Sequence, residues 1–288
     1  MQALLSGIAI GSLFSLVALG FNITYVVNGT LNMGQGHVVM LGAMTMWSFV
    51  TLLELPFFVA LLLAGAVGAL FGVIVDIVAV RRFATSDASI SWLLSTVALA
   101  IILEDVALKY WGPEEKLLPS PVGEGTVNIF GAVLFYKELL ILPASGLILL
   151  GLYLFYNKWH WGLWLRAAAD NRTAAVLMGI SHKKAVAVAF GISGLLAGLA
   201  GGLQTPTYAV SPSMGLPMAL TAIAVAIVAG LQSPRGIVLI GLVLGVAQTM
   251  ISTYVSASLR DSVIYIAVIA VLYFRPNGLF GRVRTVKV

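Results

Sequence analysis

The sequence predicts an all-α, polytopic membrane protein. Hydrophobic residues make up 60% of its 288 residues and charged residues only 9%, whereas soluble domains are about one quarter charged. The apolar residues form long continuous runs, which are typical of membrane-spanning helices rather than of an outer-membrane barrel. The chain contains no cysteine, so disulfides and thiol chemistry are excluded. We therefore expect one transmembrane domain over 1–288.

Nine apolar runs approach the length of about 20 residues that a membrane span needs. They cover residues 3–27, 36–53, 57–80, 89–111, 138–156, 185–207, 215–232, 236–256 and 262–274. The second run begins irregularly and the last is short, so eight to nine transmembrane helices are expected. With eight, one run is a partial or re-entrant helix. The first run lacks the basic segment of a signal peptide and is expected to be a retained span.

The basic residues predict which side of the membrane each loop occupies. Most of the 16 lysines and arginines fall on one side of the predicted spans, and basic loops are retained in the cytoplasm. The exceptions, which fall on the other side, are Lys109, Lys116, Lys137 and Arg260. We therefore expect the N-terminus outside and the C-terminus in the cytoplasm, together with 81–88, 158–184 and 233–236.

Residues 7–34 resemble residues 188–215, and this similarity predicts an inverted repeat. The matches are Ser12 with Ser193, Gly20 with Gly201, Thr24 with Thr205, and Met33-Gly34 with Met214-Gly215. In each copy an apolar helix is followed by a polar break, at 28–36 and at 206–217. The predicted organisation is a first repeat (1–111), an external loop (112–137), a connecting span (138–156), a cytoplasmic coupling loop (157–184), a second repeat (185–275) and a cytoplasmic tail (276–288).

Polar side chains near the two breaks are candidates for a substrate path, because broken helices in corresponding repeats mark such paths in transporters. The candidates are Asn22, Asn32, Gln35, Gln204, Thr205 and Ser213. The alternative is that these groups bond to backbone atoms that the helix breaks leave free. We favour a mixture of the two roles, with Gln35 and Asn32 as the better path candidates.

The remaining polar residues of the spans have simpler interpretations. His37 is expected to be a satisfied structural histidine, and Asp76 to pair with Arg81. Glu104 and Asp105 precede Lys109 and are interpreted as an external ion-pair cluster. No acid is placed securely at mid-membrane, which disfavours proton coupling.

No catalytic or cofactor-binding pattern stands out in the sequence. The three histidines have no metal-ligand spacing, so no metal site is predicted. There is no phosphate-binding loop, so any ATP that drives the protein must be bound by another chain.

Residues 158–184 form a polar segment that carries five basic residues and a single acid, Asp170. Its alanines favour a short helix, Asp170 or Asn171 can cap the start, and Gly179 suits a left-handed end with Ile180 folding back. Ser181 is placed to cap the next helix. A small alanine face would let a partner approach closely. The predicted docking residues are Arg166, Ala168, Ala169, Asp170, Asn171, Ala175 and Gly179. The alternative is a solvated loop.

Four stretches together resemble the Liv-type permeases, which are membrane subunits of ABC importers for branched-chain amino acids. Residues 31–36 read L-N-M-G-Q-G, residues 165–171 read L-R-A-A-A-D-N, residues 195–201 read L-L-A-G-L-A-G, and residues 275–281 read R-P-N-G-L-F-G. They occur in the family's order over essentially the whole chain, and the short N-terminus resembles the H type. One departure is A-G-L-Q-S-P-R-G at 229–236, where the family often has G-G-x-G-S-x-x-G.

The resemblance implies partners and a location. It implies an inner-membrane permease that works with a second, M-type permease, two ATPase subunits that hydrolyse ATP, and a periplasmic substrate-binding protein. It also implies that 165–180 docks the ATPase, and that the chain is neither an enzyme nor a nucleic-acid-binding protein. The wider family also moves urea, short amides and aromatic acids. The residues alone leave open a secondary transporter or channel that acts by itself, or a membrane scaffold.

The predicted topology can be tested with single cysteines, because the chain has none of its own. Cysteines introduced at Gly123 and at Asp170 should react with a membrane-impermeant maleimide from opposite faces of the membrane. Labelling of both from the same face would contradict the predicted topology.

Overall fold

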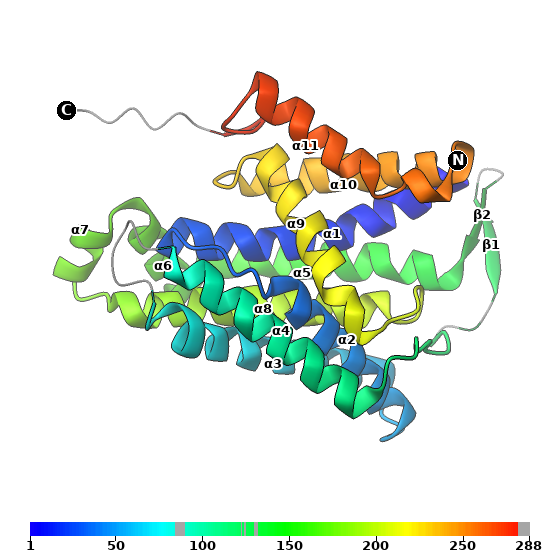
Figure 1. The fold of residues 1–288 in the computed structure, drawn as a ribbon, viewed down its shortest axis with the longest axis horizontal. Coiled ribbons are helices and arrows are strands. Elements are labelled where there is room, and N and C mark those ends of the chain that lie inside the picture. The colour runs from blue at the N-terminus through cyan, green and yellow to red at the C-terminus, as the bar shows by residue number, and fades with distance from the viewer. Residues whose placement is uncertain (84–89, 122, 124, 130–131, 282–288) are drawn as a thin grey trace.

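A computed structural model describes residues 1–83, 90–121, 123, 125–129 and 132–281 (Figure 1). Its longer helices are α1 (Gln2–Asn28), α2 (Gln35–Thr51), α3 (Phe57–Val75), α4 (Ser91–Trp111), α5 (Tyr136–Lys158), α6 (His160–Asp170), α7 (Arg172–Leu177), α8 (His182–Gln204), α9 (Gly215–Ala229), α10 (Pro234–Tyr254) and α11 (Ser262–Phe274). The short elements are a π-helix, Asp76–Val80, two 3-10 turns, Pro212–Met214 and Ala257–Leu259, and strands β1 (Thr126–Ile129) and β2 (Ala132–Phe135). Each predicted apolar run contains a helix, which confirms the all-α membrane fold.

The second predicted span is a partial helix. Within the described residues, eight helices are long and apolar enough to cross a membrane. Helix α2 is not among them, because it has only 17 residues. Its residues Gln35 to Met44 are all buried, and it packs against α3, α8 and α9. The structure therefore has the arrangement expected for eight spans, with α2 as the enclosed helix.

The two ends of the helix bundle carry different features (Figure 1). The N-terminus and the β-hairpin lie at one end, here called the hairpin end. Helices α6 and α7 and the end of α11 lie at the other, here called the α7 end. The N-terminus and the polar segment are thus at opposite ends, as the charges predict. Which end faces the cytoplasm stays a prediction.

The predicted external loop contains a hairpin, and Lys116, which precedes the hairpin, is bonded to the second break. Strands β1 and β2 are antiparallel, with Thr126 opposite Phe135. The sequence predicts a short strand-like run at 126–130, and the structure has a strand at 126–129, while Phe130 lies outside the described residues. The backbone N–H of Lys116 donates to Val210 O at 2.8 Å, and that of Val210 donates to Lys116 O at 2.9 Å. The loop is therefore fixed to the break that follows α8.

Two seams of glycine hold the bundle together. A Cβ added at Gly11 of α1 would meet Gly241 O on α10, and one added at Gly194 of α8 would overlap Gly68 O on α3. Such close backbone approach is a main source of helix association in lipid, where the hydrophobic effect between helices is absent. The glycine spacing predicts tight packing, but only the structure shows the partners. In the predicted repeat, α1 corresponds to α8 and α10 to α3, so both seams join equivalent helices.

We predict that Gly194→Ala destabilises the protein, because the new methyl group would overlap the backbone of α3. Overpacking of this kind costs about 1–3 kcal/mol or more. Gly151→Ala is the matched control, since a Cβ on that face of α5 meets no atom within 4 Å and alanine is the better helix former. Thermal unfolding in detergent measures the difference. Equal melting of the two variants would show that the α3–α8 seam is not tight.

Candidate functional site

The first break is closed by a network around Gln35, which is fully buried. The Asn32 side chain donates to Gln35 Oε1 at 3.2 Å. Gln35 Nε2 donates to the backbone oxygen of Ser193 at 3.0 Å, and the Ser193 hydroxyl donates back to Gln35 Oε1 at 3.0 Å. The amide of Gln35 therefore joins the start of α2 to the middle of α8.

The two breaks meet where α2 and α9 begin. A Cβ added at Gly36 would overlap Gly215 O, and one added at Gly215 would press on the ring of His37. Segments about 180 positions apart in the sequence therefore pack directly against each other, with both glycines buried. The repeat predicts that the two breaks face each other across a central path. The structure packs them backbone on backbone, and the path itself stays a prediction.

His37 Nε2 lies 3.1 Å from Glu104 Oε2 of α4. His37 therefore has a partner through Nε2, whereas its Nδ1 is buried without a hydrogen-bond partner among the described residues, so the histidine is only half satisfied. The contact corrects the interpretation of Glu104 as part of an external cluster. Among the described residues, no ion pair joins Glu104 or Asp105 to Lys109. Sequence proximity suggested Lys109 as the partner, but α4 turns Glu104 toward the buried start of α2. An acid is thus paired with histidine inside the bundle.

The other path candidates lie along both repeats. The Asn22 side chain donates to Leu231 O at 2.6 Å, and the Thr205 hydroxyl donates to Gly201 O at 2.9 Å. Gln204 is buried, whereas Ser213 is exposed and its hydroxyl lies 3.1 Å from that of Ser211. Several of these groups bond to backbone oxygens, as the structural alternative expects. Their part in a substrate path stays a prediction.

Tyr208 lies in the second break, and burial is the main reason why its pKa rises to about 12. The charge of Glu138 also raises the pKa, while that of Arg260 lowers it. The guanidinium carbon of Arg260 lies 5.9 Å from the centre of the Tyr208 ring. The phenol therefore stays protonated and neutral at physiological pH.

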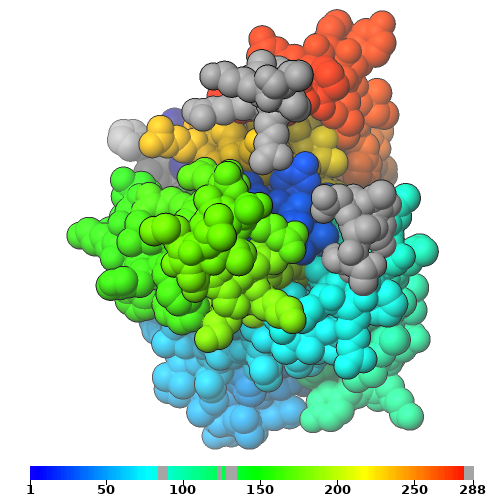
Figure 2. Space-filling view, turned by 90° about the vertical axis from the view of Figure 1, so that its left-hand side faces the viewer, coloured from blue at the N-terminus to red at the C-terminus, as the bar shows by residue number. Residues whose placement is uncertain are grey.

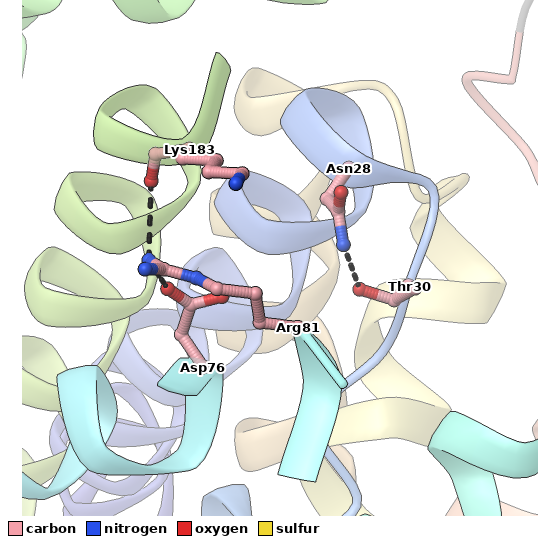
Figure 3. Close-up of polar contacts among 5 residues, drawn as sticks. All are labelled: Asn28, Thr30, Asp76, Arg81 and Lys183. Atoms are coloured by element: carbon pink, nitrogen blue, oxygen red, sulfur yellow. Dashed lines mark hydrogen bonds and ion pairs between the residues drawn. The ribbon is translucent and has the colours of Figure 1, made fainter. Parts of the chain in front are cut away.

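Asp76 pairs with Arg81 as predicted (Figure 3). Asp76 begins the π-helix, and the Arg81 N–H donates to Asp76 O five residues back at 2.7 Å. Arg81 Nη2 lies 2.5 Å from Asp76 Oδ2 and also donates to Lys183 O at 3.3 Å. The pair thereby joins the end of the α3 span to the start of α8. Beside it, the Asn28 side chain donates to the Thr30 hydroxyl at 2.9 Å.

The polar segment 158–184 contains two helices, α6 and α7, that are separated at Asn171. Asn171 caps α7 by accepting a hydrogen bond from the Ala174 N–H at 3.0 Å. Gly179 has a left-handed φ of 84°, and the Ile180 N–H donates back to Ala175 O at 3.0 Å. The predicted cap, glycine end and fold-back are confirmed. Ser181 occupies the cap position of α8, but its side chain makes no capping bond.

Two of the alanines that were predicted to face a partner protein, Ala168 and Ala175, point into this chain instead. Ala168 is 4% exposed and Ala175 5%, so both methyl groups contact this chain and not a partner. The exposed apolar residues at the tip are Leu177 and Met178, at 83% each. These two residues were not among the docking residues predicted from the sequence. Two large apolar side chains next to Gly179 in a basic segment could have indicated an exposed contact. Arg166 and Asp170 are exposed, and Ala169 is half-buried.

An open cavity of about 870 Å³ lies at the α7 end, where Figure 2 shows the end of α1 recessed between the polar segment and the last helices. Its walls are the end of α1 (25–29), the junction of α6 and α7 (168–172), His182, the turn before α10 (232–235) and Phe280. Five separate segments therefore meet around one solvent-open space.

Residues 275–281, which form the C-terminal motif, support one wall of this cavity. The Leu279 N–H donates to Val228 O at 2.8 Å, and the Phe280 N–H donates to Ala229 O at 2.9 Å. Gly278 is left-handed, at φ 80°, and no side chain fits there because a Cβ would meet the backbone of Gly230. Residues 275–281 thus pack on the turn at 229–236, where the sequence departs from the family pattern.

Comparison with known proteins agrees with this architecture. The family described as branched-chain amino acid transport system, permease component, matches residues 3–272. The chain belongs to this permease family. With eight apolar helices among the described residues and its similarity to these permeases, it is a multi-pass protein of the bacterial inner membrane.

Named relatives cover the whole permease. It is 30% identical to the high-affinity branched-chain amino acid transport system permease protein BraD of Pseudomonas aeruginosa, over 100% of this chain and 98% of BraD. It is 29% identical to the corresponding LivH protein of Escherichia coli K12, over 100% of this chain and 97% of LivH. A probable LivH of Methanocaldococcus jannaschii is 29% identical over 71% of this chain and 66% of that protein.

We predict that Gln35→Leu destabilises the permease as well as impairing transport. The change removes the side-chain partner of the Asn32 amide and of the Ser193 hydroxyl in a buried place, and each such loss costs about 1–3 kcal/mol. Ser193→Ala keeps the Gln35 bond to the backbone and should cost less. Thermal unfolding and uptake are measured on both variants. Wild-type melting of Gln35→Leu would contradict the locking role of Gln35.

Proposed function

We propose that the protein is the permease subunit of an ATP-driven importer of branched-chain amino acids. The observation that carries this proposal is the similarity to named permeases of such systems from one end of the chain to the other. In the proposed assembly it pairs with a second, M-type permease, receives substrate from a periplasmic binding protein and is driven by two ATPase subunits. It carries no nucleotide site or cofactor of its own, and the partner subunits hydrolyse ATP.

The proposed substrate path follows the junction of the two breaks, lined by Asn22, Asn32, Gln35, Gln204, Thr205 and Ser213. Support comes from the contact between the starts of α2 and α9 and from the polar groups gathered there. Because most of these groups are buried and bonded within the chain, transport requires the network to open. The free energy of binding the partner proteins is proposed to offset the free-energy cost of opening this network.

The α6–α7 segment is proposed to couple ATP hydrolysis to this movement. Arg166, Asp170 and Asn171 are exposed on it, and Gly179 turns the chain directly into α8. Since Ala168 and Ala175 face inward, they are proposed to seat the segment on its own bundle. The apolar tip, Leu177 and Met178, is proposed to enter the ATPase.

An importer for urea, short amides or aromatic acids remains the alternative substrate assignment. The names of the relatives favour branched-chain amino acids. Transport without ATP is less supported, because the buried Asp76 and the partly exposed Glu104 already have cationic or histidine partners. Reconstitution with the M-type permease, both ATPases and the binding protein tests the assignment. Labelled leucine should accumulate only with ATP, and accumulation of urea instead would overturn it.

We predict that the double change Leu177→Asp and Met178→Asp uncouples the permease from its ATPase. Two charges at an apolar contact resist desolvation, so little ATPase should co-purify, and uptake should be lost. The matched control is Leu117→Asp, which changes another exposed leucine, 60% accessible, near the hairpin end. Normal ATPase retention by the double variant would contradict the docking role of the α7 tip.

A further inference from the structure

One acidic side chain lies on the outer face of a membrane span. Helix α4, which runs on the near side of the bundle in Figure 1, packs against α2, the π-helix and the first 3-10 turn. Its buried residues form one stripe, Thr96, Ala100, Leu103 and Ala107. Asp105 is exposed, and at about 3.6 residues per turn it lies about 180° around the helix from Thr96. Its side chain therefore points away from the bundle.

Asp105 also lies within the depth expected for the hydrocarbon layer. Trp92 and Trp111 stand near the two ends of α4, as aromatic side chains do at the two membrane surfaces. The helix between them is about 28 Å long, which is close to the hydrocarbon thickness of about 30 Å. Asp105 comes about 9 Å before Trp111 along the helix axis. A lipid facing this position would meet the carboxyl group with its acyl chains.

No partner for the Asp105 carboxylate is found among the described residues. Lys109 lies one turn closer to the end of α4, but no ion pair joins the two side chains there. The other outward side chains at this level are apolar and exposed, namely Ile101, Ile102 and Val106. Ionisable residues within membrane spans are costly in lipid and almost always face protein or water. The outer face of α4 is therefore expected to be covered by protein.

The outward faces of α3 and α5 lack such a charge. They expose apolar side chains, among them Leu62 on α3 and Leu147 on α5. The charged residues of α5 lie in its first and last turns, and Asp76, which follows α3, is buried. These two faces suit contact with lipid, so the acid distinguishes the outer face of α4 from them.

We propose that this outer face, formed by Ile101, Ile102, Asp105 and Val106 and here called the α4 face, packs against the second permease. A lysine or arginine of that permease pairs with Asp105 within the membrane. The charge of Asp105 selects the kind of partner, because a cation at the same depth neutralises the carboxylate that lipid cannot solvate. The inference rests on the proposed function for the existence of a second permease.

The inner side of the same helix connects the α4 face to the two breaks. Glu104, the residue before Asp105, contacts His37 at the start of α2. Helix α4 also packs against the 3-10 turn that precedes α9. A permease bound to the α4 face therefore lies beside the junction of the breaks, and the two permeases together enclose the proposed substrate path.

The test is photocrosslinking within the assembled transporter in nanodiscs. Ile101, Leu62 and Leu147 are replaced, one at a time, by the photoreactive residue benzoylphenylalanine. All three side chains are exposed on outward faces of spans. Light should join position 101 to the second permease, and positions 62 and 147 should not react with it. Adducts of position 101 with lipid alone, or with a second copy of this chain, would overturn the proposal.

A second variant tests the charge. If the α4 face met lipid, Asp105→Leu would leave assembly unchanged, because leucine suits lipid better than an acid. In the proposed interface the change leaves the cation of the partner unpaired, so the amount of second permease that co-purifies should fall about ten-fold or more.

The matched control is Glu114→Leu, which removes an exposed acid just beyond α4 and should leave assembly normal. Thermal unfolding of each purified full-length variant establishes that it is folded. Wild-type recovery of the second permease by folded Asp105→Leu would overturn the pairing of Asp105.

Uptake by the reconstituted importer separates this proposal from the proposed function. If ATP drives leucine uptake but position 101 does not crosslink to the second permease, the α4 face is wrongly assigned and the importer function stands. If leucine is not taken up while position 101 crosslinks to the second permease, the substrate assignment fails and the α4 face stands.

Discussion

Backbone contact between helices at glycine is the constraint on which this structure depends. In lipid, helices gain little by hiding apolar side chains from each other, so close approach and interhelical hydrogen bonds must supply specificity. Gly11 against Gly241 and Gly68 against Gly194 bring two pairs of helices within backbone contact. These seams hold α1 and α8 in fixed positions. The first ten residues of the short helix α2 are buried against α3, α8 and α9.

Because α2 is enclosed, water cannot provide hydrogen bonds to the polar groups of its first turn. Each unpaired polar group at such a helix start would destabilise the fold by several kcal/mol in hydrocarbon. Asn32, Gln35 and Ser193 satisfy one another there, and His37 is bonded to Glu104. The same polar groups that make a helix break possible in lipid are therefore the ones that must separate if substrate is to pass between the breaks.

The sequence predicts the position of nearly every helix and much less of how the helices face. Length and hydropathy locate the spans, and local chemistry locates the cap at Asn171 and the left-handed Gly179, because such features depend on a few neighbouring residues. Helix orientation depends on partners that are distant in sequence. A uniformly apolar helix has no polar face that would reveal its inner side, which is why the glycine partners and the His37–Glu104 contact appear only in the structure. Ala168 and Ala175 lie on short helices of the polar segment, and their inward orientation depends on the bundle against which these helices pack.

The α7 end brings the functional segments together on one short element. Six residues of helix extend about 9 Å, and α7 is fixed at one end by the Asn171 cap and at the other by the Gly179 turn. Its tip carries Leu177 and Met178 in full exposure, and its first residue, Arg172, lines the cavity. The tip proposed to meet the ATPase and the residue on the cavity wall are therefore joined by less than two turns of helix.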